Sequence, residues 1–138
     1  MTYTDPAVVS TIQNAIRAEQ NYVYACGIAG AELKGGGRRR AVAQIAERQQ
    51  RIQALAALIS EADVPTTPPA FSPPIAIDSA RSARASLAQL NNALVGVYAD
   101  MAASTEGVDR AFAVAGAQSS ARTAVQWGAP SQAFPTGD

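Results

Sequence analysis

Apolar residues recur at alternating steps of three and four along four stretches of the chain, which is the spacing of one helix face. This pattern predicts helices at about residues 6–34, 38–62, 78–104 and 107–128. Each helix carries one apolar stripe, and four such stripes can bury one another around a common core. The sequence therefore predicts an all-α protein with a single domain over residues 1–138, built as a four-helix bundle.

The residues at the ends of these stretches indicate where the helices begin and end. Asp5 can cap the first helix with Pro6 at its first position, and Asp78 can cap the third. The glycines 35–37 are expected to end the first helix and to link it to the second, because consecutive glycines cost backbone entropy in a helix. The inward positions are expected to be Val9, Ile12, Ile16, Glu19, Val23, Cys26, Gly30 and Leu33; Ala41, Ile45, Arg48, Ile52, Leu55 and Ile59; Ala80, Ala83, Leu87, Leu90, Leu94, Val97 and Met101; and Val108, Ala111, Ala115, Gln118, Arg122 and Val125, with Ser86 outside the third stripe.

A proline-rich segment at about residues 63–77 separates the two pairs of helices. Proline excludes a helix here and favours an extended backbone, which advances roughly 3.1 Å per residue. About 15 such residues reach roughly 45 Å, more than the roughly 38 Å of a 25-residue helix. The segment is therefore expected to cross the length of the bundle, between two antiparallel hairpins, and a tail at 129–138 follows the last helix.

Composition and charge narrow the functional classes. The chain has 11 basic and 11 acidic residues, so its overall charge favours neither nucleic acid nor an anionic membrane as a partner. No apolar run is long enough to cross a membrane, and the first residues lack the features of a signal peptide. We therefore expect a cytoplasmic protein. Cys26 is the only cysteine and is expected to be a small buried side chain.

Several segments carry a family resemblance. They are Ala18 to Gly27, Leu55 to Leu58, the proline-rich crossover with Phe71, Leu87 to Asn92, Val125 to Gly128, and Phe134-Pro135. Together they resemble an actinobacterial family of ferritin-like proteins that is catalogued as a domain of unknown function. The resemblance implies a ferritin-like fold over nearly the whole chain, and it implies no activity, because that family has none established.

The central question for chemistry is whether the bundle can hold two metal ions. A ferritin-like di-iron site takes a glutamate from each of two helices and a Glu-x-x-His pair from each of the other two. The chain contains no histidine, and its candidate ligands are limited to Glu19, Glu47, Gln50 and Asn91. Two carboxylates without an imidazole make a poor site for two cations. We therefore expect no catalytic residue, no metal and no cofactor.

A structural role for Glu19 is favoured instead. A glutamate within an apolar stripe is tolerated when cations and hydrogen bonds satisfy it, and costs several kcal/mol when they do not. Helix geometry places Arg48 and Arg51 near the level of Glu19, and Gln118 and Arg122 are expected to approach from the fourth helix. The sequence thus predicts a buried polar network of these five residues.

These observations favour a structural or protein-interaction module over an enzyme. A homodimer is expected, because ferritin-like bundles commonly pair through long helix faces and because Ala25, Ala29 and Gly30 would permit close approach. A different protein partner is also possible. The alternative is a metal-binding or small-ligand-binding protein, or an oxidoreductase, that uses the polar centre around Glu19 and Glu47.

Overall fold

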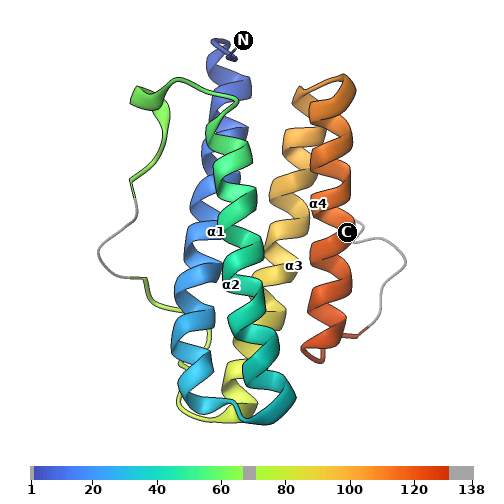
Figure 1. Cartoon of the computed structure of the whole chain (residues 1–138). Coiled ribbons are helices and arrows are strands. Elements are labelled where there is room, and N and C mark those ends of the chain that lie inside the picture. Colours follow the sequence, from blue (N-terminus) through green and yellow to red (C-terminus); the bar gives the residue numbers. More distant parts are fainter. Residues whose placement is uncertain (1, 67–70, 131–138) are drawn as a thin grey trace.

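The computed structural model describes residues 2–66 and 71–130. Within them the chain forms four long helices that lie side by side, and no strand (Figure 1). The elements are α1 (Pro6–Glu32), α2 (Gly35–Ala56), the short 3₁₀ helix η1 (Glu61–Asp63), α3 (Ala80–Ser104) and α4 (Gly107–Gln126). None of these helices is long and apolar enough to cross a membrane. Part of the expected crossover, most of the C-terminal tail and Phe134-Pro135 lie outside the described residues.

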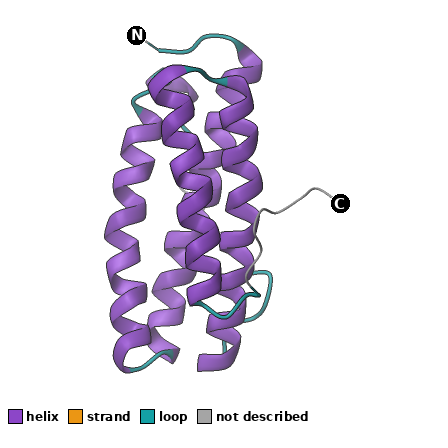
Figure 2. Ribbon diagram, turned by 90° about the vertical axis from the view of Figure 1, so that its right-hand side faces the viewer, coloured by secondary structure: helices purple, strands orange, loops and turns teal. Residues whose placement is uncertain are grey.

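The predicted topology is confirmed. Helices α1 and α2 form one antiparallel hairpin and α3 and α4 form another, while the connector after α2 returns along the bundle to the start of α3 (Figures 1 and 2). The connector follows α1, whose side chains hold it at three successive levels. Gln13 Nε2 donates to the carbonyl oxygen of Asp63 (2.8 Å), Gln20 Nε2 donates to that of Pro65 (3.1 Å), and the ring of Tyr24 packs edge-on against Phe71, with the ring centroids 6.4 Å apart.

The two hairpin turns have the same construction. The first residues of α2 and α4 are Gly35 and Gly107, with φ of +56° and +62°, in the left-handed region that glycine adopts without strain. Three residues later, Arg38 and Arg110 each share their Nε–H between two carbonyl oxygens at the end of the preceding helix, which satisfies acceptors that a helix end leaves free. The bonds are Arg38 to Gly30 (2.8 Å) and Leu33 (2.9 Å), and Arg110 to Ala102 (3.0 Å) and Thr105 (2.8 Å).

Two helix starts differ from the expectation for a local reason. The glycines 35–37 lie in the first turn of α2 rather than in the link, because Gly35 alone makes the sharp change of direction that the chain needs there. Helix α3 is capped by Ser79, not Asp78: Ser79 and Ser82 form a reciprocal capping box, while Asp78 accepts a hydrogen bond from the Ser82 hydroxyl.

The expected apolar stripes of the first three helices largely face the core, with local exceptions. Ala80 is exposed at the start of α3, and Ser86 is fully buried rather than outside the packed face. Ala25 and Ala29 are also fully buried, so their small size serves packing inside the bundle and leaves no surface for a partner. The buried apolar side chains of α1 to α3 are Val9, Ile12, Ala15, Ile16, Tyr22, Ala25, Cys26, Ala29, Ala41, Leu55, Ala83, Leu87, Ala88, Leu94, Val95, Tyr98 and Met101.

Helix α4 is rotated relative to the prediction. Val108 is 84% exposed and Val125 is 43% exposed, although both were expected to point inward. The decisive residue is Gly116, where an added Cβ would lie 2.9 Å from the Tyr98 ring, so that only glycine lets this ring lie against the helix. The side of α4 that packs inward is therefore the one that contains Gly116, and its buried residues are all small: Ala113, Gly116, Ser120, Thr123 and Ala124.

Replacing Gly116 with alanine should destabilise the protein by about 1 to 3 kcal/mol, because the new methyl group overpacks against the Tyr98 ring. Gly96 provides a matched control, since it is an exposed helical glycine with nothing within 4 Å of its Cβ position. Gly96→Ala should stabilise the protein by about 0.5 to 1 kcal/mol. Urea unfolding of the three proteins measures both changes, and equal effects at the two glycines would refute the packing described for α4.

Candidate functional site

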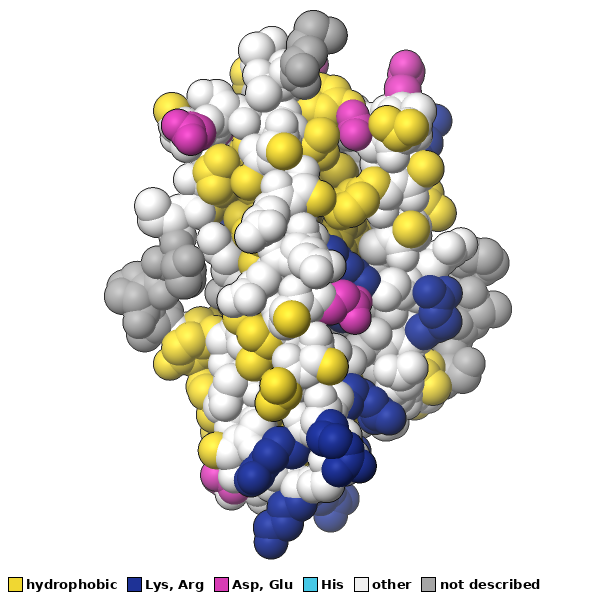
Figure 3. Space-filling model, viewed as in Figure 1, with side chains coloured by type: hydrophobic (Ala, Val, Ile, Leu, Met, Phe, Trp, Pro, Cys, Tyr) yellow, Lys and Arg dark blue, Asp and Glu magenta, His cyan; other side chains and the backbone are white. Residues whose placement is uncertain are grey.

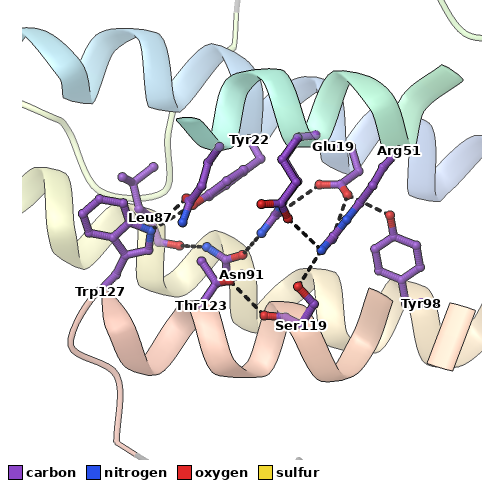
Figure 4. A network of polar contacts seen from close by, with 12 residues as sticks. Glu19, Tyr22, Arg51, Leu87, Asn91, Tyr98, Ser119, Thr123 and Trp127 are labelled. Carbon is purple, nitrogen blue, oxygen red and sulfur yellow. Dashed lines mark hydrogen bonds and ion pairs between the residues drawn. The ribbon is translucent and has the colours of Figure 1, made fainter. Parts of the chain in front are cut away.

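A buried carboxylate lies at the centre of the bundle and accepts hydrogen bonds from three side chains (Figure 4). Glu19, on α1, has no exposed surface. Its Oε1 accepts from Arg48 Nη1 (2.8 Å), and its Oε2 accepts from Arg51 Nη1 (3.2 Å) and from the hydroxyl of Tyr98 (2.7 Å). Two cations and a phenol therefore replace the water that the carboxylate loses on burial.

Arg48 is the second fully buried charge. Its other terminal nitrogen donates to Asn91 Oδ1 (2.7 Å), and Asn91 Nδ2 is held in turn by the carbonyl oxygen of Leu87 (2.8 Å). The guanidinium carbon lies 4.3 Å from the centroid of the Tyr22 ring, a cation–π contact. Burial alone would lower the pKa of Arg48, but attraction to Glu19, Tyr22 and Glu47 and the hydrogen bond to Glu19 together outweigh burial and raise the pKa. This side chain therefore stays charged.

Arg51 carries the network to the fourth helix and to the surface. Its Nη2 donates to Ser119 Oγ on α4 (2.6 Å) and to Glu47 Oε1 (3.2 Å). The side chain of Glu47 is 52% exposed, whereas that of Arg51 is 13% exposed. The two arginines and two glutamates balance in charge, and their hydrogen bonds join all four helices. The network thus extends from a sealed interior at Glu19 to a solvated edge at Glu47.

A second group of polar side chains lies beside the Arg48 guanidinium. Trp127 Nε1 donates to the Tyr22 hydroxyl (2.9 Å) and to Gln44 Oε1 (3.2 Å), and the Tyr22 hydroxyl also donates to Gln44. Burial raises the pKa of the Tyr22 phenol well above its ordinary value, so it remains a neutral donor. Through the face of Tyr22 this group continues the central network toward the end of α4.

The structure brings together only part of the predicted network. Glu19, Arg48 and Arg51 meet at the centre. Gln118 and Arg122 are exposed, because the rotation of α4 turns them to solvent and brings Ser119 inward in their place. The sequence places Tyr22 and Tyr98 on or beside the inward stripes, where a core position with a bonded hydroxyl is expected, and both are buried with such partners. Sequence reasoning missed the roles of Ser119, Gln44 and Trp127; for α4, the run of mostly small residues from Gly116 to Thr123 was the available signal.

The candidate metal ligands also separate. Asn91 is buried in the network, but its oxygen accepts from Arg48. Glu47 lies at the solvated edge and Gln50 is exposed, so these two do not face the centre as a Glu-x-x-His pair would. The inward pair on α2, at the same spacing of three, is Arg48 and Arg51.

The donor chemistry of the centre does not fit a pair of metal ions. Counterpart positions in the two hairpins are 72 residues apart, as for Arg38 and Arg110; by this spacing Glu19 corresponds to Asn91, and Arg48 to Ser120. A di-iron bundle has carboxylates and imidazoles at such positions, whereas here one buried carboxylate is shared by two guanidinium groups. Among the described residues, no group of three or more His, Cys, Asp or Glu is placed to hold a metal.

A shallow groove of about 510 Å³ lies away from this centre, beside the end of α4. Its lining includes the basic side chains of Arg81 and Arg84 and the small residues Ala88 and Gly128. The guanidinium carbon of Arg84 lies 5.8 Å from the centroid of the Trp127 ring. The lining residues include no carboxylate and no thiol, so the groove offers neither an acid–base pair nor a nucleophile of those kinds.

Comparison with known proteins agrees with this fold and supplies no activity. A family model described as "Domain of unknown function (DUF4439)" matches residues 11–138. The crystal structure of a conserved hypothetical protein, rv2844, from Mycobacterium tuberculosis is similar at a TM-score of 0.81 and 20% sequence identity, over 90% of this chain and 97% of that one. No curated protein matches.

Replacing Glu19 with glutamine should retain the fold and cost about 3 to 5 kcal/mol, because two buried or partly buried guanidinium groups would lose their shared counter-charge. Glu47→Gln is the matched control: it removes the same charge at the solvated edge, where a cost below about 1 kcal/mol is expected. Circular dichroism and urea unfolding at neutral pH measure both. Equal losses would show that burial of Glu19 does not decide its contribution.

Burial raises the pKa of the Cys26 thiol to about 12, compared with 9.0 for an unperturbed cysteine. As pH rises, the Cys26 thiol of the unfolded chain therefore loses its proton at a lower pH than that of the folded chain. The contribution of this group to stability is fully present below pH 9 and declines as pH rises from 9 toward 12, which urea unfolding at several pH values would measure.

Burial of Cys26 also predicts slow chemical labelling. At pH 8, an aromatic disulfide reagent should label Cys26 only through unfolding, and faster in Glu19→Gln than in the native protein. Rapid labelling that is independent of stability would contradict this burial.

Proposed function

We propose that this chain, which belongs to the family described as Domain of unknown function (DUF4439), is a non-enzymatic ferritin-like bundle that serves as a structural or protein-interaction module. The supporting observation is the position of Arg48 and Arg51, whose guanidinium groups lie at the centre where a di-metal bundle would hold its ions. Two fixed positive charges repel a third cation, and both oxygens of Glu19 already accept hydrogen bonds.

We propose that the buried charges of this network serve the specificity of the fold. Replacement by apolar residues would often be neutral or stabilising, so an ion pair of this kind is best explained by specificity. Because Glu19 accepts from side chains on α2 and α3, a shift of one helix along another would leave a charge unpaired. We propose that the network fixes the relative heights of the helices and so presents a rigid outer surface.

The module is proposed to be cytoplasmic and homodimeric. An unpaired cysteine suits a reducing compartment, where structural disulfides are rare. The small residues Ala25 and Ala29 no longer support the dimer, because both are buried inside the bundle. Support comes instead from large apolar side chains left exposed on α4, chiefly Val108, Val114 and Val125.

Metal analysis tests the central claim. Protein expressed in iron-rich and in manganese-rich media should contain no stoichiometric metal, and added Fe²⁺ or Mn²⁺ should leave its melting temperature unchanged, since a ligand stabilises only the state that binds it. A di-iron protein treated in parallel is the positive control. Stoichiometric metal that disappears in Glu19→Gln would overturn the proposal in favour of a metal-binding protein or oxidoreductase that uses Glu19 and Glu47.

A further inference from the structure

Helix α4 carries a second apolar stripe on its outer face. Val108, Val114 and Val125 are 84%, 42% and 43% exposed, and Ala111 and Ala115 between them are also exposed. Val108, Ala111, Val114 and Ala115 recur at steps of three and four along one side of the helix, the spacing of a packing face. On the same side, the exposed polar residues Gln118 and Arg122 separate them from Val125. Half of the large exposed apolar side chains in the described part of the chain lie on this one helix.

Charge is segregated along the bundle although the chain as a whole is neutral. Most cations lie at the end that contains the α1–α2 turn, and most carboxylates lie at the opposite end (Figure 3). The basic end carries Lys34, Arg38, Arg39, Arg40, Arg81 and Arg84, opposed by Glu32 and Asp78. The acidic end carries Asp5, Glu61, Asp63, Asp100, Glu106 and Asp109, opposed by Arg110.

This polarity favours one arrangement of two copies. Opposite ends lie side by side only when two bundles pack antiparallel, and a two-fold axis then brings them together twice. An axis near Ala115, at the middle of α4, places Val108 of each copy at the level of Arg122 of the other. Glu106 lies one residue before α4, within reach of that level. Among the described residues, neither Arg122 nor Glu106 forms an ion pair within its own chain.

We infer that two copies of this chain pack antiparallel through the outer faces of α4, with the stripe from Val108 to Val125 buried and Arg122 of each copy beside Glu106 of the other. The inference rests on the proposed homodimer and adds its surface and orientation. The face is self-complementary in both respects that a two-fold interface requires, since its apolar centre meets itself and its charged ends meet their opposites.

The face is tested by sedimentation equilibrium and by light scattering after size exclusion, over a range of concentrations. The native protein should be a dimer. Val114→Arg places a charge near the proposed axis and should make the protein monomeric at the same concentrations, with an unchanged circular dichroism spectrum and a cooperative urea transition that no longer depends on protein concentration. Val42→Arg is the matched control, because Val42 is 58% exposed on α2, and it should leave the dimer intact.

The orientation is tested by exchanging charges. Arg122→Glu alone and Glu106→Arg alone should each weaken the dimer by roughly tenfold in dissociation constant, since each creates two like-charged pairs across the axis. The double variant should recover the native affinity, because each pair is restored with its signs reversed. High salt should reduce both effects.

The outcomes separate the two proposals. A native protein that is monomeric throughout overturns the homodimer and this interface together. A dimer that survives Val114→Arg overturns the α4 face and leaves the homodimer standing. A dimer that Val114→Arg dissociates but that the double charge variant fails to restore overturns the antiparallel orientation.

Discussion

The structure depends on the ion pair between Glu19 and Arg48, because both charges are removed completely from water. Moving either one alone into the interior would cost several kcal/mol, so each is tolerated only while the other is in place. The pair sets further conditions: Glu19 needs the Tyr98 hydroxyl, and Arg48 needs Asn91. Helices α1, α2 and α3 must therefore pack at one relative height. The alanine-rich surfaces around the ion pair would not by themselves select that height.

The packing around this pair follows from the same requirement. Tyr98 reaches Glu19 with its ring against α4, and Gly116 leaves the space for that ring. The hairpin turns support the heights from outside, since Arg38 and Arg110 fasten the start of each returning helix to the end of the one before it. Two equivalent turns thus determine how far each helix extends, and the central ion pair selects the one alignment that leaves no charge unpaired.

The sequence predicts the number and order of the helices and most of the first three inward stripes, because their large aliphatic side chains have a clear period. It fails on α4, where alanine and valine occur all round the helix and two apolar stripes compete. The choice between them is made by Tyr98 on another helix, which only Gly116 can accommodate. The inward faces of α1 and α2 were predicted, so Glu19 and its arginines could be expected at the centre. The inward face of α4 was not predicted, so Ser119 could not.

The covalently attached cations also change what the fold can do. In a di-metal bundle the central positive charge comes from solution, so the interior responds to metal supply. Here the guanidinium groups of Arg48 and Arg51 supply positive charge at the centre, and they are part of the chain itself. On the function proposed above, the centre has become a fixed support and interaction has moved to the surface. The outer stripe of α4 carries half of the large apolar side chains that the described residues expose, so the feature that misled the sequence prediction is the one that the proposed dimer would bury.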